Sequence, residues 1–285
     1  MTRWFASSAN WLASKTTPAV TSASELHSFS KPPSFQLTQS PNPAWRTGRG
    51  MTEDAVGAME WKRQEETGWK TWALGDMQSK DIYPLLTSAI IPRPIAFVSS
   101  LSPDGVPNLA PFSYFSMVSH DPPLLSISFS LSPRRPKDTR ENILATKEFT
   151  VNIISEPFIE AANATSVEAP SDVDEWVLSG LTRMDSVDVK PACVRESAAS
   201  FECELYHAQD IPPNSSSPTH TLVLGLIKRA HTRNAVMAED GKTLDPAKLR
   251  AVARLGGKMY GRVGEGFELA RPSWKSMKEE LKGGN

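Results

Sequence analysis

The chain has 285 residues, of which 39% are hydrophobic, and its formal net charge is −1. This length allows one large or two small domains, and the near-neutral charge gives no general electrostatic reason to expect a nucleic-acid partner. No apolar run reaches the ~18 residues that a membrane span requires. The two cysteines, Cys193 and Cys203, suggest no disulfide framework, so a reducing, cytoplasmic environment is the default expectation.

The first part of the chain differs in composition from the rest. Residues 1–52 are rich in Ser, Thr and Pro, and they carry several basic residues against one acid, Glu25. Such a segment buries too little apolar surface to offset the entropy of ordering it. We therefore expect residues 1–75 to be a leader that is largely disordered or loosely ordered. Its basic, acid-poor composition leaves a mitochondrial transit peptide open as an alternative.

Apolar residues from Ile82 to Ile90 recur at helical spacing and predict a helix that ends before Pro92. A long β section follows it. We expect strands over residues 94–101 and 106–118, joined at a Pro-Asp-Gly turn, and a third strand over 124–130.

The second half mixes short helices with strands. Asp138 or Thr139 and Ser155 are expected to cap helices, and Asp245 followed by Pro246 to begin the last one. The expected elements are a helix over 138–146, a strand over 148–154, a helix over 155–163, a capping arrangement at 171–174, strands over 198–211 and 219–230, and a last helix that ends at 254–257. Mostly short strands with a few helices favour a closed or partly closed antiparallel barrel.

Several common site patterns are absent from the sequence. The five histidines are scattered without metal-ligand spacing, and the two cysteines lie too far apart for a CxxC arm, so no metal site is expected. Neither a P-loop nor a GxGxxG turn after a predicted strand is found. No GxSxG marks a hydrolase nucleophile.

Two features point to a bound ligand. Pro111 lies within an expected strand, where proline cannot donate to the ladder; this suggests a strand that leaves its ladder there and frees backbone groups for a planar ligand. Arg134, Arg135 and Lys137 precede the helix start at Asp138, so cations and helix N-terminal amides would converge on a phosphate. A solvated basic loop is the alternative explanation of this cluster.

Four segments resemble the flavin-reductase-like family, in particular its flavoprotein oxygenase subgroup with a late ARLGG motif. They are PRPIAFVSS at 92–100, PNLAPFSYF at 107–115, RPKDT at 135–139 and ARLGG at 253–257. The resemblance covers about 81–260. It implies a mainly β fold, an FMN-binding split β-barrel with a few short flanking α-helices, over residues 76–274, followed by a C-terminal tail at 275–285.

The resemblance also implies FMN as the cofactor. No catalytic side chain is assigned. The implied cofactor-binding residues are Asn108, Leu109, Ala110, Pro111, Phe112 and Ser113 for the ring, Lys137, Asp138 and Thr139 for the phosphate, Ser99 and Ser100 on the ribityl or phosphate side, Asn163 from the following helix, and Arg93 and Arg254.

The activity implied is NAD(P)H-dependent flavin reduction, with hydride transfer from the nicotinamide to flavin N5. The cofactor carries this chemistry and the protein orients it, so a dedicated acid–base pair is not required. A homodimer with FMN near the subunit interface is expected, with no nucleic-acid or membrane partner. Two alternatives stay open: an FMN-binding protein without turnover, and an FMN-dependent enzyme that acts on an unidentified small organic substrate.

Overall fold

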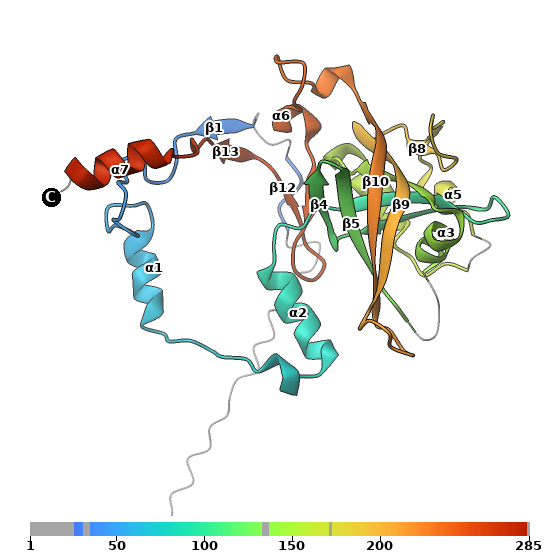
Figure 1. The fold of residues 1–285 in the computed structure, drawn as a ribbon, viewed down its shortest axis with the longest axis horizontal. Coiled ribbons are helices and arrows are strands. Elements are labelled where there is room, and N and C mark those ends of the chain that lie inside the picture. The colour runs from blue at the N-terminus through green and yellow to red at the C-terminus, as the bar shows by residue number, and fades with distance from the viewer. Residues whose placement is uncertain (1–25, 31–34, 133–136, 171–172, 284–285) are drawn as a thin grey trace, which may run out of the picture. The chain divides into compact units, whose positions relative to one another are not determined.

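The computed structural model describes residues 26–30, 35–132, 137–170 and 173–283. It divides into two compact units, Met1–Pro33 and Ser34–Asn285, and only residues 26–30 of the first unit are described. All helices and strands named below belong to the second unit (Figure 1). Within the described ranges, no helix combines the length and apolar character that crossing a bilayer would take.

A seven-stranded antiparallel sheet forms the centre of the second unit. Its strand order is β3-β2-β6-β9-β10-β5-β4, so β3 and β4 are the two edge strands. The bounds are β2 Ala96–Leu101, β3 Pro107–Phe112, β4 Phe115–His120, β5 Pro123–Ser130, β6 Glu148–Ile153, β9 Ala199–Ile211 and β10 His220–Thr232.

The sheet buries apolar side chains on both faces. Along β2, Ala96 and Val98 belong to one core cluster, while Phe97 belongs to a second one. This alternation follows from the two-residue period of a strand. The first cluster is centred on rings such as Phe149, and a Cβ atom added at Gly225 would lie 2.4 Å from that ring. Glycine therefore lets β10 lie directly against Phe149.

Short helices lie around the sheet. α3, Asp138–Thr146, packs against β2, and both α4, Ile159–Ala164, and α5, Glu175–Ser179, contact β3. The remaining elements are β1 Gln36–Thr38, α1 Ala58–Glu65, η2 Leu74–Asp76, α2 Ser79–Ala89, η3 Glu156–Phe158, β7 Arg183–Met184, β8 Cys193–Val194, η4 Asn234–Val236, α6 Pro246–Leu249, β11 Val252–Arg254, β12 Tyr260–Arg262, β13 Glu265–Phe267 and α7 Trp274–Gly283. β1 pairs in parallel with β13.

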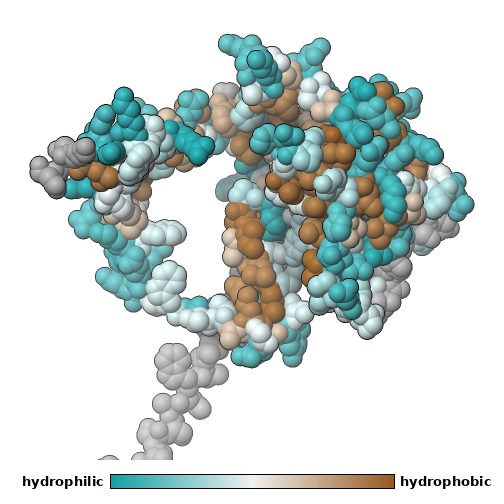
Figure 2. Space-filling model, viewed as in Figure 1, coloured by the Kyte–Doolittle hydropathy of each residue, from teal (hydrophilic) through white to brown (hydrophobic). Residues whose placement is uncertain are grey.

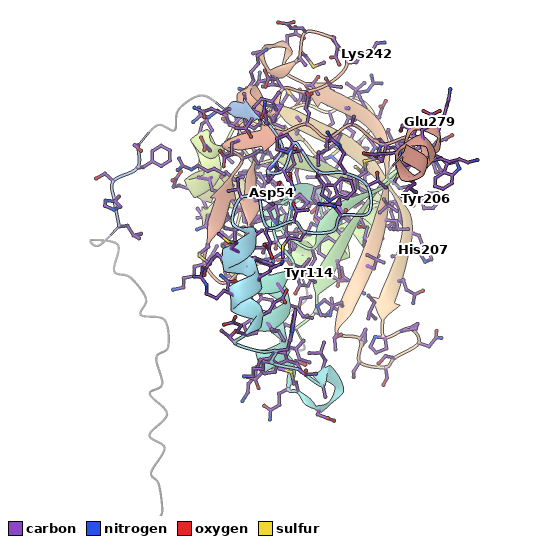
Figure 3. The ribbon with its side chains drawn as sticks, turned by 90° about the vertical axis from the view of Figure 1, so that its left-hand side faces the viewer. Asp54, Tyr114, Tyr206, His207, Lys242 and Glu279 are labelled. Atoms are coloured by element: carbon purple, nitrogen blue, oxygen red, sulfur yellow. The ribbon has the colours of Figure 1, made fainter. Side chains whose placement is uncertain are left out.

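The strand expected over 106–118 is in fact two strands. β3 pairs with β2 at one edge of the sheet, and β4 pairs with β5 at the other. The chain passes between the edges at Ser113 and Tyr114, the latter labelled in Figure 3. Three residues span at most ~10 Å, so the sheet must curl until its two edges come close at this point. Ser113 is a common turn residue, but no Gly, Asn or Asp stands beside it to mark a turn, so the break was not expected.

Several helix predictions also need correction. The N-cap residue of α3 is Lys137, where the sequence predicted Asp138 or Thr139. The helix that begins at Pro246 ends at Leu249, because Arg250 adopts a left-handed conformation with φ 49°, and the residues expected as its last turns form β11. Asp245 does cap this helix, through the N–H of Ala247. Ser155 is the N-cap residue of η3, but its side chain makes no capping bond; its hydroxyl donates to the carbonyl oxygen of Leu249 instead.

In the arrangement expected at 171–174, residues 171–172 lie outside the described residues. Asp174 is itself the N-cap of α5, since its carboxylate accepts the N–H of Trp176. Asp174 therefore precedes the helix, whereas the sequence pattern had placed it at the third helical position.

Candidate functional site

A cavity of about 290 Å³ lies beside edge strand β3. Its walls come from β3, from the start of α3, from the segment after α4 and from the first residue of α5. The lining residues are Asn108, Ala110, Pro111, Phe112, Ser132, Lys137, Asp138, Thr139, Thr165, Ser166, Val167, Glu168, Ala169 and Glu175.

The free side of β3 forms one wall. The N–H of Leu109 donates to Glu175 Oε2 at 3.3 Å, so it points away from β2. Pro111 lies two residues further and faces the same way, so its missing N–H breaks no bond of the ladder. β3 stays paired with β2 on both sides of Pro111. The expectation that the strand leaves its ladder there was wrong: the backbone groups on this side lie outside the ladder because β3 is an edge strand.

A buried hydrogen-bond network fixes the side chain of Asn108, which is 8% exposed. Its Oδ1 atom accepts the hydroxyl of Thr139 and, at 3.4 Å, that of Ser100. Asn142 donates to Ser100 Oγ at 3.1 Å. These donors leave the Asn108 amide nitrogen to face Glu175, at 3.2 Å from Oε2. The network joins β2, β3, α3 and α5, and its members Asn108, Thr139 and Glu175 line the cavity.

Glu175 is the buried acid of this site, with 6% of its surface exposed. Burial raises the pKa of its carboxyl above the ordinary value, and the negative charge of Asp138 adds to that increase. Hydrogen bonds from its own backbone and from Leu109 oppose it. The Glu175 carboxyl therefore takes up a proton more readily than an exposed glutamate does.

The first turn of α3 provides a place for an anion. Its N-cap residue, Lys137, makes no side-chain capping bond, and Lys137, Asp138 and Thr139 all line the cavity. The first N–H groups of a helix have no partner within it, and the helix dipole favours negative charge there. The Thr139 hydroxyl is already bonded to Asn108, so an anion would meet backbone amides and the Lys137 ammonium first. Arg134 and Arg135 lie outside the described residues.

The predicted site residues fall into two groups. Asn108, Ala110, Pro111, Phe112, Lys137, Asp138 and Thr139 are brought together around the cavity. Arg93, Ser99, Ser100, Leu109, Ser113, Asn163 and Arg254 are not among the residues that line it. Ser99 and Ser100 are buried behind β3, and the Leu109 side chain belongs to the second core cluster.

Arg93 and Arg254 link the β11–β12 hairpin to α2. Their backbones form an isolated antiparallel bridge. The Arg93 guanidinium donates to the carbonyl oxygens of Thr87 and Ile90 at the end of α2, and to that of Leu255. These contacts give the late motif a structural role. A contact of either arginine with a flavin stays a prediction.

Asn163 contacts the same hairpin. Its Oδ1 atom accepts the hydroxyl of Tyr260 at 2.8 Å, and the Arg254 guanidinium lies 4.4 Å from the centre of the Tyr260 ring. The sequence analysis missed Glu175 and the wall at residues 165–169. Both lie between the RPKDT motif at 135–139 and the ARLGG motif at 253–257. Neither was assigned to the site from the sequence. In the described ranges, no group of His, Cys, Asp and Glu side chains is arranged to hold a metal ion.

The fold agrees with the folds of related proteins. Residues 88–245 match the model of the flavin reductase like domain family. This match covers more than half of the chain, so the chain belongs to that family. Membership places it among the flavin-related oxidoreductases.

Solved structures support the same assignment. Nitrilotriacetate monooxygenase component B from Bacillus cereus is 34% identical with a TM-score of 0.68, over 71% of this chain and 99% of that one. The 2-nitrobenzoate 2-nitroreductase NbaA from Pseudomonas fluorescens is 27% identical with a TM-score of 0.64, over 72% and 98%. A protein with a split barrel domain from Shewanella frigidimarina NCIMB 400, 22% identical with a TM-score of 0.60 over 73% and 100%, shares the fold.

Proposed function

We propose that this protein is an FMN-dependent oxidoreductase that reduces its flavin with NAD(P)H. One observation carries the proposal: a single cavity joins the free edge of β3 to the uncapped first turn of α3. A flavin mononucleotide has matching parts, a planar hydrogen-bonding ring at one end and a phosphate at the other. The family match at 88–245 lies within 76–274, the range that we propose as the flavin domain.

In this assignment the ring lies along Ala110, Pro111 and Phe112. Backbone groups on the free side of β3 would bond its polar edge, and the Phe112 side chain supplies apolar contact. The phosphate lies toward Lys137 and the amides of the first turn of α3. When bound, the flavin supplies the hydride-accepting chemistry, while these residues hold and orient it.

We further propose that the protein is a homodimer. Ile90 and Ile91 after α2 are 64% and 47% exposed, and Met117 and Val118 on edge strand β4 are 69% and 51% exposed. Figure 2 shows apolar side chains gathered along α2. Contiguous exposed apolar surface marks interaction sites, and two-fold pairing is the commonest way to cover it. Sedimentation equilibrium across a dilution series tests this: a monomer at every concentration would contradict it.

A second candidate is reduction of a small organic compound by the bound flavin. The 27% identity to a 2-nitrobenzoate 2-nitroreductase over 72% of this chain favours it. Two assays separate the candidates. Oxidation of NAD(P)H that increases with added free FMN supports flavin reduction, whereas oxidation that depends on a nitroaromatic acid at fixed flavin supports the second candidate. Tight FMN binding without NAD(P)H oxidation in either assay would indicate a flavin carrier.

A further inference from the structure

The lining of the cavity poses an electrostatic problem for a phosphate. It contains one described cation, Lys137, and three acids, Asp138, Glu168 and Glu175. A phosphate monoester adds up to two negative charges. Glu168 is exposed and screened by water, but Glu175 is buried. The buried carboxylate is therefore the one whose charge conflicts most with a phosphate-bearing ligand.

On the basis of the proposed function, we propose that Glu175 is a specificity-determining residue: its carboxyl binds a proton from solvent when a phosphate-bearing flavin enters the cavity. A flavin without phosphate, such as riboflavin, requires no such proton. The balance is one proton taken up per flavin phosphate bound, with no other bond made or broken.

Glu175 is held in place by neutral donors. Its Oε2 atom accepts from the Asn108 amide and the Leu109 N–H, and it forms no ion pair with a cation of the described residues. It also lines a second cavity of about 280 Å³ with Asn108 and Asp138, so it stands in the wall between two cavities. Turning the carboxylate away would leave both donors unpaired in a buried place, which is unfavourable. Protonation removes the charge of the Glu175 carboxyl and leaves its side chain in the same position.

The charged groups around Glu175 do not neutralise it. From α3 it faces Asp138, which raises its pKa, and Lys137 lies at the same helix start. At the N-cap of its own helix, Asp174 is paired with Arg183 at 2.6 Å. From the segment after α4, Glu168 adds a further acid. An incoming phosphate makes the net charge around Glu175 more negative and therefore favours the protonated form of its carboxyl.

A hydrogen-bond chain connects the phosphate position to Glu175. The Thr139 hydroxyl donates to Asn108 Oδ1, and the Asn108 amide donates to Glu175. Thr139 is in the first turn of α3, where the phosphate is proposed to lie. A ligand there therefore changes the charge beside Glu175 and the donor network that positions it.

The test compares the affinity for FMN and for riboflavin by fluorescence titration between about pH 5 and about pH 8. In the wild-type protein, FMN affinity should fall with rising pH by up to about tenfold per pH unit more than in Glu175→Gln, since one linked proton gives that slope. The second ionisation of the FMN phosphate, near pH ~6, contributes equally in both proteins and cancels in the comparison. Riboflavin should show no such difference.

Two further variants serve as controls. Glu168→Gln removes one negative charge from the same cavity at an exposed position, and it should keep the wild-type pH slope. Glu175→Asp keeps a carboxyl, so its FMN affinity should still fall with rising pH. This variant provides a second test if Glu175→Gln misfolds. Calorimetry in buffers of different ionisation enthalpy should record about one more proton taken up by wild type than by Glu175→Gln.

The outcomes are distinguishable. Equal FMN slopes in wild type and Glu175→Gln, or the same pH dependence for riboflavin, would overturn the role of Glu175 while leaving the flavin site standing. Failure of both flavins to bind the wild-type protein at any pH would overturn the proposed function, and this inference with it.

Discussion

The hydroxyl of Thr139 donates a hydrogen bond to Oδ1 of Asn108, which ties the first turn of α3 to edge strand β3. The two residues are separated by 31 positions in the sequence and both line the same cavity. The bond therefore sets the distance between the parts of the site that we assign to the ring and to the phosphate.

Removal of that bond should weaken both folding and flavin binding. Thr139→Val leaves Asn108 Oδ1 with only the longer bond from Ser100, and a lost buried hydrogen bond destabilises by about 1–3 kcal/mol. Urea unfolding and FMN titration measure the two effects. Thr139→Ser keeps the hydroxyl and should stay close to wild type; a serine variant as weak as the valine variant would indicate that the methyl group, and not the bond, matters.

Lys137→Ala should weaken FMN much more than riboflavin. A hydrogen bond to a charged group contributes about 1.5–3 kcal/mol, so the FMN dissociation constant should rise by roughly 10- to 150-fold. The exposed Lys258, outside the cavity lining, provides a matched control as Lys258→Ala. An equal loss of affinity for both flavins in Lys137→Ala would contradict the placement of the phosphate at this end of the cavity.

The part of the site formed by β3 and the start of α3 was predictable from the sequence because its residues lie in compact motifs. Asn108 to Phe112 come from one strand, and Lys137 to Thr139 from one helix start, so local pattern and resemblance sufficed. Glu175 was not predictable: it meets Asn108 across 67 positions, and an acid at a helix start looks the same whether it is solvated or buried. Only the packing of α5 on β3 decides which.

The fold showed the same limit. The strand positions of β9 and β10 were predicted from the sequence. The division between β3 and β4 was not, since the break depends on which partner strand each half finds. Similarly, the helix expected to reach 254–257 ends at Leu249, because β11 pairs with β12 and the Arg93 backbone bridges Arg254. Tertiary pairing overrides local helical propensity there.

Gly256→Ala should destabilise the protein. A Cβ atom at Gly256 would lie 2.9 Å from the Ser88 side chain and 3.1 Å from its Cα, so α2 would have to move. Overpacking of this kind costs about 1–3 kcal/mol. Gly264→Ala places its methyl group where no atom lies within 4 Å and should change the free energy of unfolding little. Equal thermal stability of both variants would contradict close packing of the late motif on α2.

Acid should destabilise the fold in part through Glu202. Burial alone would raise the pKa of this carboxyl, but the bonds from His231 and from the N–H groups of Val187, Asp188 and Val189 outweigh it and lower the pKa. A lowered folded-state pKa means stability that is present above the unfolded value, near 4.5, and is lost as pH falls through the folded value.

Urea unfolding at a series of acidic pH values measures this effect. Glu202→Gln should lose less stability than wild type on acidification below about pH 4.5, because it has no carboxyl to protonate. Glu268→Gln, at an exposed position, serves as the control and should behave like wild type. An acid sensitivity of Glu202→Gln equal to that of wild type would show that other groups account for the loss.

The central claim is that this cavity holds a flavin that accepts hydride from a nicotinamide. Anaerobic mixing of the full-length protein, saturated with FMN, with NADH or NADPH tests it most directly. The visible absorbance of the oxidised flavin should disappear with at least one nucleotide far faster than in a protein-free mixture, and Lys137→Ala should lose this advantage at limiting FMN. Bound flavin that neither NADH nor NADPH reduces faster than free FMN would contradict the claim.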